Sequence, residues 1–350
     1  MADNILTIKD LYVEYNTDDA DVFALNGMNL TLKRGDSLGL VGETGAGKTT
    51  TALSVLKLLP PGVGKITKGS IVYDGIDIIE AKESEMRKIR GARISMIFQD
   101  PMSSLNPIVP VGDQIYEVLE LHFPKMTREE KNNKVDEVLE MVGIQKSRKH
   151  EYPHQFSGGM KQRIGIAMAL VSEPELLFAD EPTTALDVTI QAQILKLMQE
   201  LQTKFGTSMI LITHDLGVVA EFCESVAVVY AGEVIESGHV EEVFTRERNH
   251  PYTNGLFGSI PDLTTDAKRL TPIAGFMPDP TDLPQGCKFA DRCSHASDRC
   301  RRETPSLYSI GNHKIKCFQF DNATDGEKRP ADDNIGIQAH DRVPKEEGGA

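Results

Sequence analysis

The stretch Gly42–Thr49, GETGAGKT, follows the short apolar run Ser37–Val41 and precedes a helical pattern that continues over Lys48–Leu59. It fits G-x-x-x-x-G-K-[ST], in which the backbone N–H groups of a glycine-rich loop surround nucleotide phosphates. Strand, loop and helix in this order are the context that the pattern requires, since the helix directs its positive N-terminal end at the anion. The stretch therefore predicts a nucleotide-binding α/β domain.

The residues of this loop have expected parts in binding ATP. Glycine is needed where a Cβ atom would keep the backbone away from the phosphates. Lys48 is expected to reach the β- and γ-phosphates, and Thr49 to offer its hydroxyl to Mg²⁺. The alternative, a glycine turn without a ligand, does not account for the strand before the loop and the helix after it. The expected nucleotide-binding residues here are Gly42, Glu43, Thr44, Gly45, Ala46, Gly47, Lys48, Thr49 and Thr50.

Acidic side chains follow a second apolar run, Leu176–Ala179, which is expected to be a buried strand. Asp180 and Glu181 come directly after it. Ligands bind at the carboxyl ends of strands in α/β sheets, so Asp180 suits water-mediated ligation of Mg²⁺ and Glu181 suits a general base. Alone, the pair could cap a helix before Pro182. With the glycine loop upstream, we favour the catalytic interpretation.

Two more polar residues end predicted strands. His214 follows Met209–Thr213, where a neutral imidazole can bond the γ-phosphate, and Gln99 ends the β-rich run Arg93–Gln99. In isolation a histidine at a strand end is more often structural, but in this order of motifs we favour a functional role for His214. An exposed glutamine at a strand end usually has no function, and a role for Gln99 is implied only by the family resemblance given below. The expected catalytic residues are Glu181, His214 and Gln99, and the expected Mg²⁺ site comprises Thr49, Gln99 and Asp180.

Strands alternating with helical patterns predict a mixed, largely parallel α/β core. Alternating apolar residues over Leu6–Tyr15 and Val22–Lys33 predict strands of a separate antiparallel β subdomain, and Ser70–Asp77 is expected to be one strand. From Val111 to about Ser172 the pattern is helical, which predicts an inserted helical lobe. A segment around 250–283 rich in Pro, Thr and Asp is typical of a linker, and a small cysteine-rich module follows it.

Composition limits the possible functions. The chain has 350 residues and a net charge of −14, and this acidic balance argues against a nucleic-acid partner, which favours a basic surface. No apolar stretch approaches the roughly 18 residues that span a bilayer. The N-terminal sequence has neither the basic region nor the apolar core of a secretory signal. We therefore expect the chain to stay in the cytoplasm and to reach a membrane only through a partner.

A second string, FSGGMKQR at Phe156–Arg163, resembles the signature motif of ABC transporter ATPases. Together with the motifs above, over residues 5–245, it resembles the nucleotide-binding subunit of an ABC transporter. The usual signature is LSGGQ; Phe156 and Met160 differ here, but the serine and both glycines remain. The resemblance implies a P-loop NTPase core and a head-to-tail dimer of two such domains, with two ATPs between them.

The resemblance also implies roles for individual residues. Gln99 would sense the nucleotide and the transmembrane subunit, His214 would be the switch histidine, and Asp187 would be the D-loop aspartate at the dimer interface. Tyr15 would stack on adenine, with Tyr12 as its competitor. The signature residues would contact the γ-phosphate held by the partner subunit: Ser157, Gly158 and Gly159.

The strings QDPMSSLNP (Gln99–Pro107), HPYTNGL (His250–Leu256) and GCKFADRCSHASDRC (Gly286–Cys300) resemble the oligopeptide/dipeptide importers within that family. This implies a second homologous ATPase subunit, two transmembrane permeases, an extracytoplasmic solute-binding protein and a peripheral location at the cytoplasmic face of the membrane. Relatives that import nickel, glutathione or other small solutes remain an alternative. So do a soluble ABC ATPase acting on nucleic acid or ribosomes, a regulatory ATP-binding module and an exporter.

The expected domains are an ATPase domain over residues 1–248 with its helical subdomain at about 100–172, a C-terminal extension over 249–320, and an acidic, disordered tail over 321–350.

Four cysteines of the extension form the pattern C-x5-C-x6-C-x16-C: Cys287, Cys293, Cys300 and Cys317. The pattern lacks the C-x-x-C pairs of structural zinc sites, yet four thiolates can close a tetrahedral site for Zn²⁺ or an iron–sulfur cluster. The importer resemblance favours a [4Fe–4S] cluster, with Zn²⁺ and free or disulfide-bonded cysteines left open. Cys223 lies apart from them and is expected to be a buried hydrophobe.

Overall fold

The computed structural model describes residues 4–100, 104–183, 188–245, 248–259 and 273–321. Within these residues the strands form a four-stranded antiparallel sheet, in the order β2-β1-β4-β5, and an eight-stranded mixed sheet, in the order β11-β12-β10-β9-β3-β8-β7-β6. In the larger sheet, β9, β3, β8, β7 and β6 are parallel, and β10, β12 and β11 are antiparallel. This is the mixed, largely parallel core with an antiparallel subdomain that the sequence predicts.

The bounds of the strands are β1 (Asn4–Asn16), β2 (Asp21–Lys33), β3 (Ser37–Val41), β4 (Gly64–Tyr73), β5 (Ile76–Asp77), β6 (Ile94–Ile97), β7 (Leu176–Asp180), β8 (Ser208–Thr213), β9 (Ser225–Tyr230), β10 (Glu233–His239), β11 (Tyr308–Ile310) and β12 (His313–Ile315). The helices are α1 (Lys48–Val55), α2 (Glu83–Ile89), α4 (Val111–His122), α5 (Arg128–Met141), α6 (Gly158–Leu170), α7 (Val188–Phe205), α8 (Leu216–Phe222), α9 (Val240–Phe244), α10 (Pro251–Gly258) and α11 (Asp298–Arg302).

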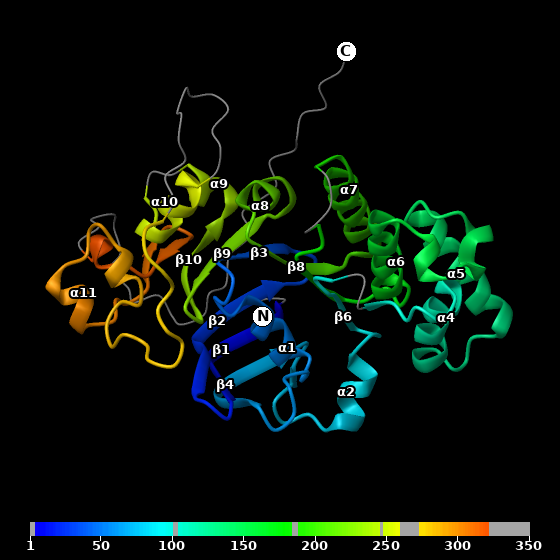
Figure 1. Ribbon diagram of the computed structural model, residues 1–350, viewed down its shortest axis with the longest axis horizontal. Coiled ribbons are helices and arrows are strands. Elements are labelled where there is room, and N and C mark those ends of the chain that lie inside the picture. Colours follow the sequence, from blue (N-terminus) through cyan, green and yellow to red (C-terminus); the bar gives the residue numbers. More distant parts are fainter. Residues whose placement is uncertain (1–3, 101–103, 184–187, 246–247, 260–272, 322–350) are drawn as a thin grey trace, which may run out of the picture.

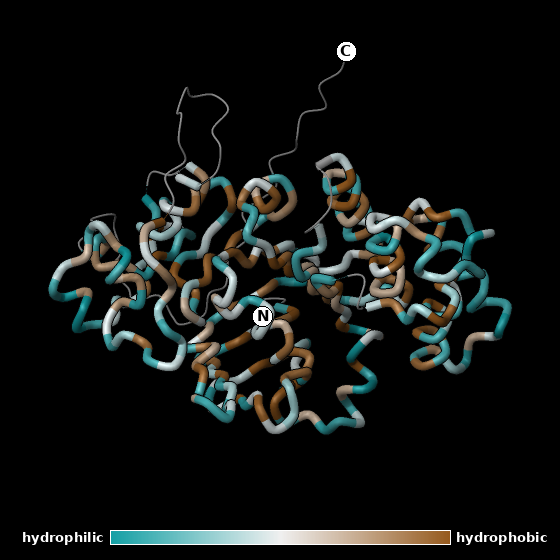
Figure 2. The backbone as a smooth tube through the Cα atoms, viewed as in Figure 1, coloured by the Kyte–Doolittle hydropathy of each residue, from teal (hydrophilic) through white to brown (hydrophobic). Residues whose placement is uncertain are grey.

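The parallel strands form the centre of the molecule. Every residue of β3, β7, β8 and β9 is buried, as expected of a parallel sheet that is covered on both faces. Figure 2 shows hydrophobic residues along the central strands and hydrophilic ones along the outer turns. In Figure 1 the helical lobe with α4, α5 and α6 lies at one end of the molecule, and the module with α11 lies at the other.

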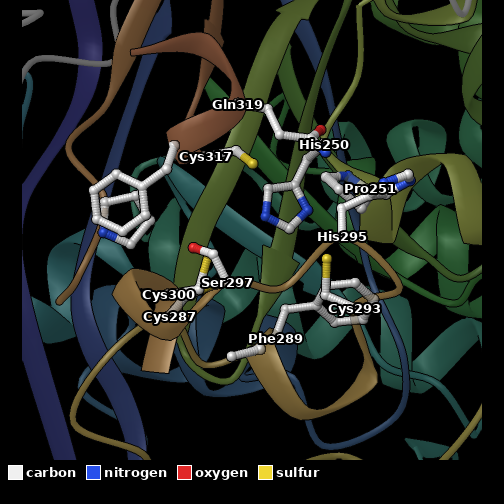
Figure 3. Close-up of a pocket in the computed structure, with 13 residues that line it drawn as sticks. His250, Pro251, Cys287, Phe289, Cys293, His295, Ser297, Cys300, Cys317 and Gln319 are labelled. Atoms are coloured by element: carbon white, nitrogen blue, oxygen red, sulfur yellow. The ribbon is translucent and has the colours of Figure 1, made fainter. Parts of the chain in front are cut away.

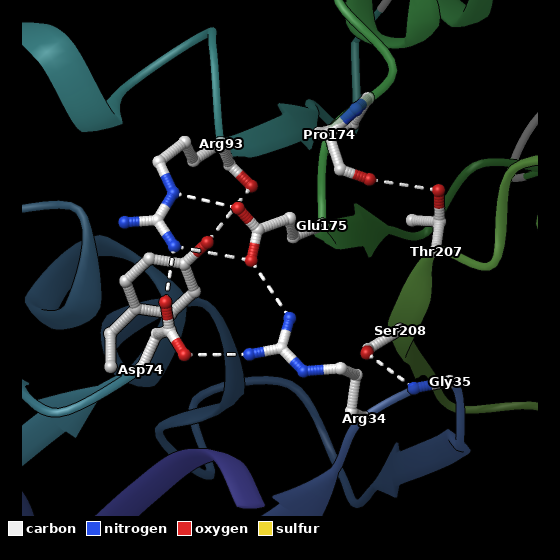
Figure 4. Close-up of polar contacts among 9 residues, drawn as sticks. Arg34, Gly35, Asp74, Arg93, Pro174, Glu175, Thr207 and Ser208 are labelled. Carbon is white, nitrogen blue, oxygen red and sulfur yellow. Dashed lines mark hydrogen bonds and ion pairs between the residues drawn. The ribbon is translucent and has the colours of Figure 1, made fainter.

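A charged network joins the antiparallel sheet to the amino ends of the core strands (Figure 4). Glu175, just before β7, accepts hydrogen bonds from Arg93 at 2.7 Å and from Arg34 at 2.8 Å. Asp74, after β4, accepts one from Arg34 at 2.6 Å and another from Arg93. Two carboxylates and two guanidinium groups thus balance each other where the two sheets meet.

Three predicted elements differ from the structure. The segment around 250–283, predicted to be a linker, contains the helix α10 at Pro251–Gly258. The helix after the glycine loop ends at Val55 and not at Leu59, because Lys57 takes a left-handed backbone conformation at φ 50°. The predicted strand Ser70–Asp77 is a hairpin of β4 and β5, since Asp74 and Gly75 turn the chain with φ values of 47° and 79°.

The strands β10, β11 and β12 were not predicted from the sequence. Of these, β12 pairs with β10 through Glu236–Ile315 and Ser237–Lys314. The C-terminal extension therefore continues the core sheet.

Candidate nucleotide-binding site

The glycine loop joins β3 to α1, as its sequence predicts. Gly47 lies at φ 100°, and a Cβ atom there would come within 2.8 Å of the Ala24 carbonyl oxygen, so this position needs glycine in both conformation and space. Lys48 is the first residue of α1, and its ammonium donates to the carbonyl oxygens of Gly42 at 2.6 Å and Glu43 at 2.9 Å. The lysine is thus held along the loop.

The carboxyl ends of β7 and β8 bring the other predicted residues to the same edge of the sheet. The Thr49 hydroxyl donates to Asp180 Oδ2 at 2.8 Å. Glu181 is contacted from two sides: its Oε2 accepts from Gln99 at 3.1 Å, and its Oε1 lies 3.2 Å from His214 Nδ1. The three residues predicted to be catalytic therefore form one polar cluster around a carboxylate.

Burial shifts the pKa values of two charged side chains at this edge of the sheet. Burial lowers the pKa of Lys48, opposed by the negative charges of Glu181, Asp180 and Glu43. Burial raises the pKa of Asp180, opposed by its hydrogen bond from Thr49. Both pKa shifts reflect the cost of burying a charged side chain. A bound ligand that carries charges of both signs would lower this cost for Lys48 and for Asp180.

A pocket of about 460 Å³ lies at this edge. It is lined by residues of the glycine loop and the start of α1, among them Lys48, and by Tyr15, whose hydroxyl lies 3.2 Å from that of Thr50. Tyr12, the competitor of Tyr15, is not among the lining residues. Three lining residues were not predicted from the sequence: Val22, Ala24 and Pro280. They belong to no local motif, because they come to the pocket from segments that are distant in the sequence from the glycine loop.

The signature residues lie apart from this pocket. Ser157 is the N-cap of α6, where its hydroxyl accepts from the Met160 N–H at 3.4 Å, and Ser157 and Gly158 are exposed. None of Ser157, Gly158 and Gly159 lines the pocket within the described part of the chain. Asp187 lies outside the described residues.

The four cysteines of the extension line one cavity of about 240 Å³ (Figure 3), together with His250, Phe289 and His295. All four are half-buried free thiols, and burial raises the pKa of Cys287 to about 11. Over the described ranges, no three His, Cys, Asp or Glu side chains are grouped closely enough to hold a single metal ion. Cys223, in contrast, is buried in the core, as expected.

Among the helices of the described residues, none is long and apolar enough to cross a membrane.

Comparisons with known proteins agree with this geometry. The family described as ABC transporter matches residues 25–184, and the family described as oligopeptide/dipeptide transporter, C-terminal region, matches residues 235–300. The chain is 47% identical to the dipeptide transport ATP-binding protein DppD of Bacillus subtilis (strain 168), over 91% of this chain and 96% of that protein. It is 48% identical to the oligopeptide transport ATP-binding protein OppD of the same organism, over 90% of this chain and 88% of that protein.

Solved structures resemble the chain as well. The ATP-binding cassette MJ0796, in a dimeric post-hydrolysis state bound to ADP and Pi, matches with a TM-score of 0.61 and 28% identity, over 67% of this chain and 98% of that one. The cbiO1 subunit of the Clostridium perfringens cbiONQ transporter matches with a TM-score of 0.61 and 33% identity, over 70% of this chain and 92% of that one. On fold, motifs and relatives together, the chain is an ATPase that belongs to the ATP-binding subunits of the ABC peptide-importer family.

Proposed function

We propose that this chain hydrolyses ATP to power the uptake of oligopeptides or dipeptides through partner permeases. Its relatives are named for dipeptide and oligopeptide transport, and the peptide-transporter C-terminal region follows the ATPase core in the same chain. The observation that carries the proposal is the convergence of Lys48, Glu181 and His214 on one pocket.

Residues in and beside the pocket have separate roles in the binding and hydrolysis of ATP. The N–H groups of the loop and Lys48 bind the phosphates. Thr49 and Asp180 supply hard oxygen donors that fit Mg²⁺, which would neutralise phosphate charge when bound. Glu181 takes the proton of the attacking water as general base, and Gln99 and His214 hold the Glu181 carboxylate in place. Tyr15, which also lines the pocket, stacks on adenine.

The signature residues serve a second ATPase subunit in this proposal. The exposed N-terminus of α6, capped by Ser157, offers N–H groups that suit a phosphate. Their position outside this chain's own pocket supports a head-to-tail dimer in which they complete the partner's site. The cassette MJ0796 has a dimeric structure. The D-loop role of Asp187 stays a prediction.

An apolar groove of about 280 Å³ between the core and the helical lobe suits a permease. Phe98 and Leu121 line it and are 45% and 70% exposed, which is unusual for large apolar side chains. Phe98 directly precedes Gln99, so a segment docked in the groove would act on the Glu181 cluster through one peptide unit. A peripheral place at the cytoplasmic face of the membrane and an extracytoplasmic solute-binding protein complete the proposed assembly.

The proposed domains are the ATPase domain over residues 1–248, the extension over 249–320 and the tail over 321–350. The match of the C-terminal region from residue 235 supports a boundary in this part of the chain. Because β12 pairs with β10, the two domains share one sheet.

Lys48→Ala tests the proposed function. In the assembled transporter with its permeases, we expect the variant to lose ATP turnover and ATP-driven peptide uptake, because the phosphates lose their buried cation. Lys57→Ala, just beyond the end of α1, removes an ammonium that donates to the Ile79 and Ala81 carbonyl oxygens and is the matched control. Near wild-type turnover in Lys48→Ala would refute the assignment, and turnover without peptide uptake in the wild type would refute the substrate class.

The cysteine cavity is proposed to hold a [4Fe–4S] cluster that braces the extension. Four soft thiol donors around one cavity fit such a group. A cluster is larger than one ion and keeps its ligands further apart, so the absence of a compact ligand group among the described residues disfavours Zn²⁺ more than the cluster. The raised pKa of Cys287 means that binding must displace a proton there.

Protein purified without oxygen should be brown, with iron and sulfide in equal amounts and a broad visible absorbance. Cys293→Ser should lose that absorbance, whereas Cys223→Ala in the core should keep it. Colourless protein with one zinc per chain would replace the cluster with zinc, and protein with no metal would refute the site.

A further inference from the structure

The C-terminal extension contacts the phosphate loop directly. Arg292 lies in the extension just before Cys293, and its side chain is only 5% exposed. Its guanidinium donates two hydrogen bonds to the carboxylate of Glu43, at 2.6 Å and 3.0 Å. Glu43 is the second residue of the phosphate loop, 249 positions earlier in the chain. This two-pronged geometry is the strong form of an arginine–carboxylate pair.

Other contacts fix Arg292 itself. Its Nε donates to the Ala274 carbonyl oxygen at 3.0 Å, and one Nη lies 3.4 Å from the Tyr230 hydroxyl. The side chain also lies over the rings of Tyr230 and Phe289. The guanidinium is therefore held in one orientation before it meets Glu43, so little side-chain freedom is lost in the pairing.

The backbone of Glu43 is held as well. Its N–H donates to the hydroxyl of Tyr252 at 2.9 Å. Tyr252, in α10, is fully buried and packs edge-on against Tyr230 and Phe289, with ring centroids 4.7 Å and 5.5 Å away. Both the side chain and the amide of one loop residue are thus bonded to residues beyond position 248.

A third contact lies at the nucleotide pocket. Pro280 of the extension lines this pocket, and its carbonyl oxygen accepts from the Phe23 N–H in β2 at 2.9 Å. The extension therefore contacts the phosphate loop through Arg292 and Tyr252 and lines the pocket through Pro280.

Charge explains why the Arg292 contact matters. A carboxylate in a loop that binds a polyanion repels it unless a cation neutralises it. Lys48 donates to the Glu43 carbonyl oxygen, so a shift of Glu43 would also move the lysine that binds phosphate. From these contacts we propose that the extension is part of the ATP site, with Arg292 and Tyr252 as positioning residues that neutralise and fix Glu43. This inference rests on the proposed ATP site.

Binding of methylanthraniloyl-ATP to the full-length chain, and KM and kcat for ATP in the assembled transporter, test the proposal. Arg292→Gln should weaken binding and raise KM about tenfold, with kcat within about twofold, because the unpaired Glu43 carboxylate repels the phosphates without touching the Glu181 cluster. Arg301→Gln is the matched control: it removes an exposed arginine of the same module that pairs with Asp291 at 2.8 Å. Its affinity should equal that of the wild type.

Rescue separates positioning from folding. Adding Glu43→Gln to Arg292→Gln should restore most of the lost affinity, because the repelling charge is gone. A double variant as weak as Arg292→Gln, or Arg292→Gln as tight as Arg301→Gln, would overturn the proposal. Tyr252→Phe, which removes one hydroxyl from a packed ring, should weaken binding about threefold. If Arg292→Gln does not fold, Tyr252→Phe provides the test, because wild-type affinity in Tyr252→Phe would also overturn the proposal.

Lys48→Ala, run in parallel, keeps the two hypotheses apart. If Lys48→Ala binds the analogue like the wild type, the ATP site itself is misassigned. If Lys48→Ala loses binding while Arg292→Gln and Tyr252→Phe keep it, only the role of the extension is wrong.

Discussion

The two ends of strand β7 both carry acidic side chains, but their surroundings are opposite. At the amino end, Glu175 accepts hydrogen bonds from Arg93 and Arg34 and shares both arginines with Asp74. At the carboxyl end, Asp180 accepts from the neutral hydroxyl of Thr49, and Glu181 contacts Gln99 and His214. One end balances its charges within the protein, and the other end faces a pocket.

The direction of the pKa shifts shows the same contrast. The hydrogen bond from Arg93, and then that from Arg34, lower the pKa of Glu175 against the effect of burial. Burial raises the pKa of Asp180, and the bond from Thr49 only opposes it. Glu175 therefore favours folding when ionised, whereas ionised Asp180 costs stability until a cation binds. At the carboxyl end of β7, Thr49 and Lys48 offset the effect of burial on the pKa of Asp180 only in part, and this is the end that faces the pocket.

Glu181→Gln should give the largest effect and tests the function of the carboxyl end. Loss of a positioned general base typically costs about 10²–10⁴ in rate, while the amide can still contact Gln99 and His214, so ATP binding should persist. Single-turnover cleavage of ATP in the assembled transporter measures this step. Glu175→Gln, at the other end of the same strand, is the control with an unchanged rate. An unchanged rate in Glu181→Gln would contradict the role of Glu181 as general base, and with it the functional difference between the two ends of β7.

Asp180→Asn should give a smaller effect. It should raise the stability of the nucleotide-free protein and reduce the stabilisation by Mg²⁺–ATP. Without nucleotide, the variant should be more stable by about 1 kcal/mol, or about 2 °C in Tm, because a buried charge is replaced by an amide that still accepts from Thr49. With Mg²⁺ and ATP, the wild type should gain about 2.7 kcal/mol at a hundredfold excess over Kd, and the variant should gain much less. Thermal melts with and without Mg²⁺–ATP measure both. A nucleotide-free variant less stable than the wild type would contradict the unbalanced charge.

Glu175→Gln should give the smallest effect, on stability alone. Since Glu175 is about one-third exposed, we expect a loss of about 1 kcal/mol, with KM for ATP unchanged. Because the folded pKa of Glu175 is lowered, its contribution is fully present above the ordinary glutamate pKa of about 4.3 and is lost as the pH falls through the folded value. The Tm values of wild type and variant should therefore converge in acid. A constant difference across that range would show that packing, and not charge, explains the loss.

Local sequence predicted where several of the site candidates lie in the fold, next to the ends of buried strands. Gly47, Lys48 and Asp180 stand where the pattern of apolar runs places them, because the strand that precedes each motif is short, wholly buried and easy to recognise. The hairpin at Asp74–Gly75 and the early end of α1 were missed, since both depend on left-handed residues whose types do not require that conformation.

Contacts across long separations could not be predicted in the same way. The pairing of β12 with β10 adds a three-residue run without a strand pattern of its own to the edge that β10 presents beyond β9. Pro280 lines the pocket although it lies more than two hundred residues after the glycine loop, and no motif marks it.

The sequence by itself determined the nucleotide loop, the acidic strand end and the family, because these depend on the order of residue types over a few positions. Only the tertiary structure decided that Glu43 meets Arg292 and Tyr252, and that the four cysteines line one cavity. The physical reason is that local backbone geometry fixes the first set. The contacts of Glu43 depend on how the extension packs against the core, through many weak contacts between segments more than two hundred residues apart. The cysteine cavity depends on how His250 and Pro251 pack against the later residues of the same extension.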